Sequence, residues 1–256
     1  MWSVGISVSP CADATRIGYD ERQINRIVIR MAQYFLDRNM RVIFGHDWRE
    51  DGVMRAVANF AEPVAARRAE AREEETGHLQ PENREEPRML NVVPTGQTSL
   101  SRTAREAQRL SGGVLEVIPL NAVEEYAHEP VAAYQHKHHD NERARELTNL
   151  RREITKRLAP GCRVCLGGKT SGYEGREPGV QEEAQLALEY NKPLYLMGGF
   201  GGATRNFGTM TDPGVDYWCS ANGLDHDEKR ELFETTDLEH AFRLISAGIQ
   251  PFTEKV

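Results

Sequence analysis

Two short apolar runs, separated by one amphipathic segment, make up the start of the chain. Residues 2–8 and 40–44 are mostly apolar and too short for stable helices, so each is expected to form a strand. Between them, Asp20 precedes a segment in which apolar residues recur every three or four positions, which predicts a capped helix over residues 20–39. A strand, a helix and a second strand in succession indicate the beginning of a parallel sheet.

The same alternation continues through most of the remaining sequence. Further strands are expected at residues 89–94, 113–119, 161–166 and 192–197, and further helices after Gly52 and Pro178 and at residues 101–110, 141–158, 227–233 and 238–247. These segments predict an α/β protein with a Rossmann-like, open, mostly parallel sheet flanked by helices on both faces. No repeat or linker divides the chain, so residues 1–256 are expected to form one domain, with a charged insertion at about residues 62–88.

Composition narrows the choice of partners. The formal net charge of −7 disfavours nucleic acid as a partner, because such binding depends on basic side chains that gather phosphates. The apolar runs are shorter than the roughly 18 residues that a membrane span needs, and the first residues lack the basic flank of a signal peptide. We therefore expect a cytoplasmic protein without membrane association. We also expect a homo-oligomer and no cofactor.

Cysteine and histidine clusters raise the question of a metal or redox site. Cys162 and Cys165 form a C-x-x-C pattern, but it lies within the expected strand at residues 161–166, where residues three apart point to opposite faces. We therefore expect both cysteines in the core. The histidine-rich stretch at residues 128–139 could chelate a metal, but no carboxylate–histidine spacing fits a known site, so we expect a solvated surface and no metal.

Candidate binding residues follow the expected strands. Ligands of open parallel sheets bind beyond the carboxyl ends of the strands, and at four such ends this sequence changes to glycine, small polar or charged residues. The candidates at these ends are Ser7, Ser9, His46, Asp47, Gly167, Gly168, Lys169, Gly199, Gly201, Gly202 and Arg205.

Two of these strand ends are glycine clusters, which suit a phosphate. Any one glycine fits an ordinary turn, but clusters after two consecutive strands let backbone N–H groups approach an anion closely. Lys169 and Arg205 add positive charge. Because neither G-x-x-x-x-G-K-[ST] nor, after the first strand, G-x-G-x-x-G is present, a P-loop or a standard dinucleotide site is not expected.

Two adjacent glutamates lie near the start of the helix expected after Pro178. Proline suits the start of a helix, which places Gly179 in the first turn and Glu182 and Glu183 just inside it. The helix dipole stabilises a carboxylate there, which is a sufficient structural reason for either residue. Alternatively, one of them lies beside a ribose, where it binds the hydroxyls or assists cleavage of an N-glycosidic bond.

The sequence GGKTSGYEGREPGVQEEAQLALEYNKPLYLMGGFGG at residues 167–202 resembles the SLOG superfamily, a Rossmann-like group of nucleotide-related proteins. Its PGVQEE segment is similar to the second half of the P-G-G-x-G-T-x-x-E motif of LOG (lysine-decarboxylase-like) proteins, with Val180 at the threonine and Glu183 at the functional glutamate. The same helix is similar to the catalytic-glutamate helix of nucleoside 2-deoxyribosyltransferases, again at Glu183. GISVSP and GHDWREDG resemble the first two strand ends of SLOG domains from prokaryotic defence systems.

Three hypotheses about function remain open. The resemblance implies a sensor or effector that binds a nucleotide or an ADP-ribose-like ligand in nucleotide signalling or antiviral defence. The second hypothesis is an N-glycoside hydrolase or transferase in which Glu183 is catalytic, and the third is an assembly protein with a vestigial cleft. Tyr217 or Trp218 could stack on a base or pack in the core. We place the sensor ahead of the enzyme.

Overall fold

A computed structural model of the chain describes residues 1–45, 48, 52–76, 88–93, 102–120, 142–210 and 217–253. Strands and helices alternate through these ranges, as the sequence predicts. The elements are, in order, β1 (Ser3–Ser9), α1 (Ala12–Arg16), α2 (Glu21–Leu36), β2 (Arg41–Phe44), α3 (Val53–Thr76), β3 (Met89–Val93), α4 (Arg102–Leu110), β4 (Leu115–Pro119), α5 (Glu142–Lys156), β5 (Gly161–Gly167), α6 (Gly179–Glu189), β6 (Leu194–Met197), the 3₁₀ turn η1 (Gly198–Phe200), α7 (Gly202–Gly208), α8 (His226–Glu234) and α9 (Leu238–Thr253).

The described strands form one six-stranded sheet in the order β4-β3-β2-β1-β5-β6, and all neighbouring pairs are parallel. The chain builds outward from β1 to β4 and then returns through α5 to place β5 on the other side of β1. The strand order therefore reverses between β1 and β5, which makes their carboxyl ends the topological switch point of the sheet. The register pairs Ser9 with Gly167 at this point.

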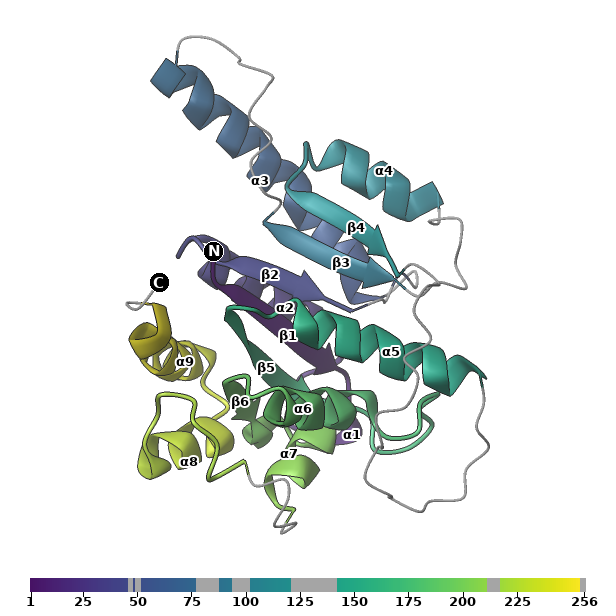
Figure 1. The fold of residues 1–256 in the computed structure, drawn as a ribbon, viewed down its shortest axis with the longest axis vertical. Helices are drawn as coiled ribbons and strands as arrows, with labels where there is room; N and C mark the ends of the chain where they lie inside the picture. The colour runs from purple at the N-terminus through teal and green to yellow at the C-terminus, as the bar shows by residue number, and fades with distance from the viewer. Residues whose placement is uncertain are drawn as a thin grey trace.

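Helices cover both faces of the sheet, which gives three layers (Figure 1). On one face, α2, α3, α4 and α9 bury the largest apolar cluster against the strands. On the other face, α5 packs over β2 and β3, and α6 and α7 pack over β5 and β6. The predicted Rossmann-like α/β fold is confirmed.

Local sequence signals explain most element boundaries. The Asp20 carboxylate accepts a hydrogen bond from the backbone N–H of Gln23 at 2.8 Å and so caps α2 as predicted.

The charged segment expected as an insertion begins inside a helix, because α3 continues past Pro63 to Thr76. Alanine, glutamate and arginine are strong helix formers, so a helix can continue there without a large apolar face.

The two cysteines of the C-x-x-C pattern are buried on opposite faces of β5, as predicted. Cys162 lies in the cluster beneath α2 and α9, whereas Cys165 lies beneath α6 and α7. Burial raises the pKa of each thiol to about 12, and the positive charge of Arg163 partly offsets that increase. Both side chains are therefore neutral core residues at physiological pH.

Candidate functional site

The switch point is closed by a tight turn at the end of β5. The backbone N–H of Gly168 donates to the carbonyl of Ser9 at 2.8 Å, which joins the ends of β1 and β5. Gly168 has φ +98°, and a Cβ there would lie 2.9 Å from the Cβ atoms of both Val180 and Ala203. Only glycine fits this position, so the predicted Gly167–Gly168 pair brings the N-terminal ends of α6 and α7 to the end of β1.

Glu183 is held at this edge by a buried arginine of β5. The Arg163 side chain is 1% exposed, and its Nη1 lies 3.3 Å from Glu183 Oε2. The same guanidinium donates from Nη1 to Ser7 Oγ at 2.7 Å and from Nη2 to Thr155 Oγ1 at 2.9 Å. A charge-assisted network of this kind fixes the direction of the glutamate carboxylate. We refer to Ser7, Thr155, Arg163 and Glu183 as the Arg163 network.

The second oxygen of Glu183, Oε1, lies near the end of β2. A Cβ built on Gly45, at the end of β2, would lie 3.8 Å from Glu183 Oε1. The Glu183 side chain is 14% exposed, so it reaches solvent although its arginine partner does not. One carboxylate oxygen is therefore anchored inward, and the other lies near the carboxyl ends of the central strands, where it could accept a hydrogen bond.

Glu182, the adjacent residue, has a different environment. Its Oε1 accepts a hydrogen bond from Thr148 Oγ1 at 2.5 Å, and its Oε2 forms an ion pair with Arg151. Both partners lie on α5, whereas the partner of Glu183 lies on the sheet. Successive residues of a helix point about 100° apart, so one glutamate links α6 to α5 and the other faces the strands. The two carboxylates, although adjacent in the sequence, therefore face different parts of the structure.

The N-terminal end of α6 is the better placed of the two predicted anion sites. Its N-cap residue, Pro178, makes no side-chain cap hydrogen bond within the described chain, so the N-cap side chain itself does not occupy this helix end. Gly179 packs against the Arg151 guanidinium, so a side chain there would require Arg151 to move. Lys169 is exposed in the loop that leads to this helix. The helix dipole and Lys169 add positive potential at this end of α6, whereas the charge of Arg151 is paired with Glu182.

The glycines after β6 are engaged within the protein. The N–H of Gly202, which begins α7, donates to Asp13 Oδ2 of α1 at 3.0 Å, and the N–H of Ala203 donates to the carbonyl of Gly168 at 2.9 Å. Gly201, with φ +76°, lies against the Asp13 side chain. A phosphate at Gly201 and Gly202 would therefore have to displace the Asp13 carboxylate.

Gly199 and Arg205 lie toward α8. A Cβ on Gly199 would lie 2.5 Å from the carbonyl oxygen of Thr235, just after that helix. Arg205 Nη2 lies 3.5 Å from Glu234 Oε2, and its Nη1 lies 3.4 Å from the carbonyl of Gly198. In the described part of the chain, no contact joins either residue to Glu183.

Packing explains the two predicted aromatic residues, and other predicted features lie outside the described residues. Tyr217 is buried in the core beside Trp218, and Trp218 Nε1 donates to the carbonyl of Gly208 at 2.9 Å, so both aromatics serve packing. His46, Asp47 and the histidine-rich stretch at residues 128–139 lie outside the described residues. Of the helices that are described, none has the length and apolar character to cross a bilayer. Nor does the described chain contain a group of three His, Cys, Asp or Glu residues able to hold a metal.

Sequence reasoning missed Arg163 and Asp13. The signal for Arg163 was present, because a charged residue in the middle of the apolar run GCRVCLG must be buried with a partner or break the strand. Asp13 carried no such signal, since a short acidic segment after a strand is ordinary loop composition. Its role depends on α1 packing against α7.

Comparison with known proteins identifies one related family. The sequence model described as SLOG cluster2 matches residues 1–232, a span that includes all the strands that the structure describes and the whole Arg163 network. The search of curated proteins gives no match.

Proposed function

Because the chain belongs to the SLOG cluster2 family, we propose that it binds a nucleotide or an ADP-ribose-type ligand at the carboxyl edge of its parallel sheet. Membership of this family suggests a nucleotide-related role. The observation that carries the proposal is the position of Glu183 at the switch point, anchored by the buried Arg163. The proposed role is that of a sensor or effector in nucleotide signalling or antiviral defence.

The arrangement suits the two ends of a nucleotide. The outward oxygen of Glu183 accepts hydrogen bonds from ribose hydroxyls, and Ser9 lies at the adjacent end of β1. The phosphates lie at the N-terminal end of α6 and along the loop that contains Gly167, Gly168 and Lys169. In this proposal Gly201 and Gly202 shape the edge of the site and do not hold the phosphate directly, because Asp13 occupies that helix end.

The Arg163 network favours binding over bond cleavage. An arginine that holds one carboxylate oxygen draws negative charge away from the other, which suits a hydrogen-bond acceptor better than a nucleophile. The second candidate function is N-glycoside cleavage. It is supported by the solvent access of Glu183, since a carboxylate beside the anomeric carbon can stabilise or attack an oxocarbenium-like centre.

Ligand binding and base release, measured on the same samples, test the proposal. We would incubate wild type and Glu183→Gln with adenosine, NAD, ADP-ribose and cyclic ADP-ribose isomers, then record thermal stabilisation and free base. Glu182→Gln is the matched control, because it makes the same change on the adjacent residue that faces α5. Stabilisation by one ligand, weakened about tenfold or more in Glu183→Gln but not in the control, is the expected result.

The other outcomes are equally informative. Base release by wild type that disappears in Glu183→Gln would establish the enzyme in place of the sensor. Failure of every ligand to stabilise wild type, or equal effects of both glutamine substitutions, would overturn the proposal for Glu183.

A further inference from the structure

Asn91 is, like Arg163, a buried polar residue within a core strand. It lies in the run MLNVV of β3 and is 0% exposed. A buried amide costs free energy unless its oxygen and its nitrogen both form hydrogen bonds. Here Oδ1 accepts from Trp48 Nε1 at 2.8 Å, and Nδ2 donates to the carbonyl oxygen of Gly45 at 2.8 Å. Asn91 therefore fixes two groups at the carboxyl end of β2, as Arg163 fixes Glu183.

Trp48 is held at the carboxyl edge of the sheet by this contact. It follows the end of β2 by four residues, is partly buried, and packs against the largest apolar cluster. The hydrogen bond to Asn91 fixes the orientation of the indole, since the amide cannot move without breaking its bond to Gly45. The partly exposed indole is therefore pre-organised at the edge where ligands of parallel sheets bind.

Gly45 links Trp48 to the proposed ribose site. The strands β5, β1 and β2 are neighbours in that order and lie about 4.8 Å apart, so their ends span about 10 Å (Figure 1). The proposed phosphate site follows β5, and Trp48 follows β2. Glu183 lies between them, since it pairs with Arg163 of β5 and approaches Gly45 after β2. This order matches the phosphate, the ribose and the base of one nucleotide.

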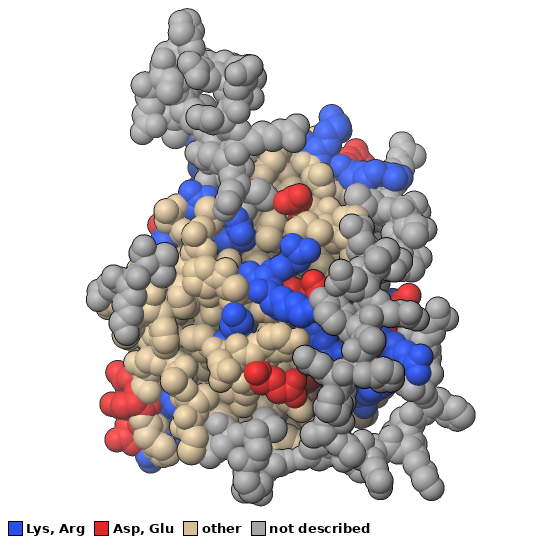
Figure 2. Space-filling model, viewed as in Figure 1, with Lys and Arg blue, Asp and Glu red and all other residues tan. Residues whose placement is uncertain are grey.

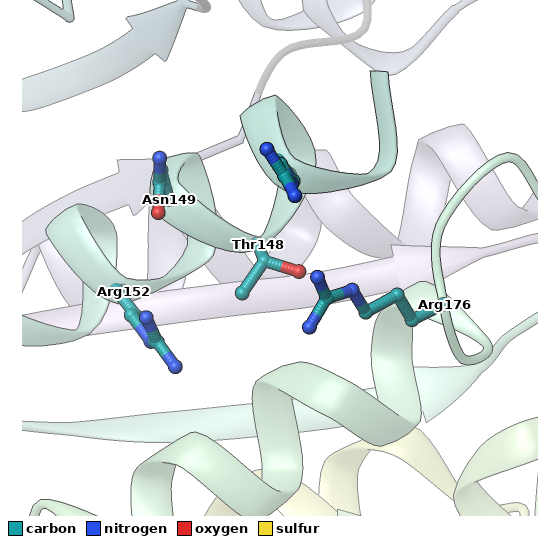
Figure 3. A pocket seen from close by; sticks show the side chains of 5 residues that line it. Thr148, Asn149, Arg152 and Arg176 are labelled. Atoms are coloured by element: carbon teal, nitrogen blue, oxygen red, sulfur yellow. The ribbon is translucent and has the colours of Figure 1, made fainter. Parts of the chain in front are cut away.

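The outer side of α5 offers a base no aromatic ring. Figure 2 shows Lys and Arg side chains, with Asp and Glu among them, at the centre of this face over α5. A pocket of about 170 Å³ lies there, and Figure 3 shows its polar lining. The described residues that line it are Arg145, Thr148, Asn149, Arg152 and Arg176. A ring on which a base can stack is instead supplied by Trp48, at the carboxyl edge of the sheet.

We propose that Trp48 determines the specificity of the switch-point site by stacking on the base of the bound nucleotide. The inference rests on the proposed function, and it adds that the ligand must carry an aromatic base. Every base has a π-face, so stacking selects nucleotides and ADP-ribose over sugar phosphates that lack a base. Asn91 contributes by holding the indole in place.

Tryptophan fluorescence tests whether a base stacks on Trp48. ADP-ribose is titrated into wild type, Trp48→Phe and Trp2→Phe while the emission is recorded. Trp2→Phe is the matched control, because Trp2 precedes β1 at the opposite end of the sheet, where its ring stacks on Phe252. A base stacked on Trp48 quenches that indole, so we expect the quenching to be lost in Trp48→Phe and retained in Trp2→Phe.

Titration calorimetry with ADP-ribose separates stacking from a purely structural role of Trp48. Trp48→Phe keeps an aromatic ring and should bind ADP-ribose within about threefold of wild type. Trp48→Ala removes the ring and should bind about tenfold or more weakly. Thermal melts of all variants verify that each is folded. Should Trp48→Ala not fold, the fluorescence of Trp48→Phe still decides the question.

Two results would contradict the role of Trp48 and leave the proposed function intact. Equal affinity of wild type and Trp48→Ala for ADP-ribose would place the base elsewhere, and quenching that persists in Trp48→Phe would assign the signal to another tryptophan. Failure of wild type to bind ADP-ribose would also overturn the inference. The proposed function would then depend on whether another ligand of the panel stabilises the protein through Glu183.

Discussion

The Arg163 network makes a quantitative prediction about stability. Arg163→Met removes the buried guanidinium and retains most of the side-chain volume. The change leaves the Glu183 side chain, which is 14% exposed, without its ion-pair partner. It also removes the N–H groups that donate hydrogen bonds to the hydroxyls of Ser7 and Thr155. Removing one partner of a buried ion pair costs about 3–5 kcal/mol. Because Glu183 retains some contact with water, we expect about 3 kcal/mol, near the lower end of that range.

The double variant isolates the pair itself. Arg163 Nε is buried without a hydrogen-bond partner in the described structure, so the arginine carries a desolvation cost of its own. In Arg163→Met/Glu183→Gln both charges are gone, and replacing a buried pair by neutral groups is often nearly neutral. We therefore expect the double variant to recover much of the loss, with a coupling energy of about 2 kcal/mol or more.

Urea unfolding of wild type, both single variants and the double variant supplies these values. With a denaturant slope of about 3 kcal/mol per molar, the Arg163→Met midpoint should fall by about 1 M. Arg157→Met, at an exposed position, should change stability by about 0.5 kcal/mol at most. An unchanged midpoint for Arg163→Met, or strict additivity of the two single substitutions, would show that Arg163 does not hold Glu183.

Further predictions concern the turn at the switch point and the buried thiols. Gly168→Ala should destabilise by about 2 kcal/mol or more, because its Cβ would lie 2.9 Å from Cβ atoms of α6 and α7; Gly172→Ala, also at positive φ but with nothing within 4 Å, should cost about 1 kcal/mol in the same urea assay. Equal losses would contradict the close-packing argument. Burial raises the pKa of the Cys162 and Cys165 thiols from 9.0 to about 12. As the pH rises, these thiols therefore lose their protons in the unfolded chain before they do so in the folded protein. Their contribution to stability is therefore complete below about pH 9 and is lost from there to about pH 12, by about 1.4 kcal/mol per pH unit for each thiol. Urea midpoints at pH 8 and pH 10 measure this loss. A thiol reagent at pH 8 should label the exposed Cys219 rapidly and both strand cysteines only after unfolding; rapid native labelling of either would contradict their burial.

Most of the fold was predictable because its signals are local. Asp20 caps α2, apolar residues at spacings of three and four form its buried face, and the strands are short apolar runs between polar turns. The unpredicted helices α1 and α7 are short, and α7 begins in a glycine cluster with low helix propensity. Its first N–H groups find acceptors on Asp13 and Gly168, which come from other parts of the chain.

The candidate site was likewise predictable only in part. Its location at the carboxyl ends of the strands followed from the βαβ pattern, and Glu183 followed from the resemblance of PGVQEE to a family motif. The contacts that give each predicted site residue its own environment could not be read from the sequence. Gly199 and Arg205 belong to the packing of α8, and Gly202 is engaged by Asp13, because those neighbours are distant in sequence.

The sequence by itself determined the layered α/β fold, the edge at which we propose that a ligand binds and the helix that presents the glutamates, since hydrophobic periodicity and turn residues act over a few positions. Tertiary structure alone decided that Glu182 joins α6 to α5 while Glu183 turns to the sheet and its buried arginine. Two adjacent carboxylates in one helical turn are nearly identical in their local chemistry. Their difference comes from the partners that folding brings to each side of the helix, Arg151 on α5 and Arg163 on β5.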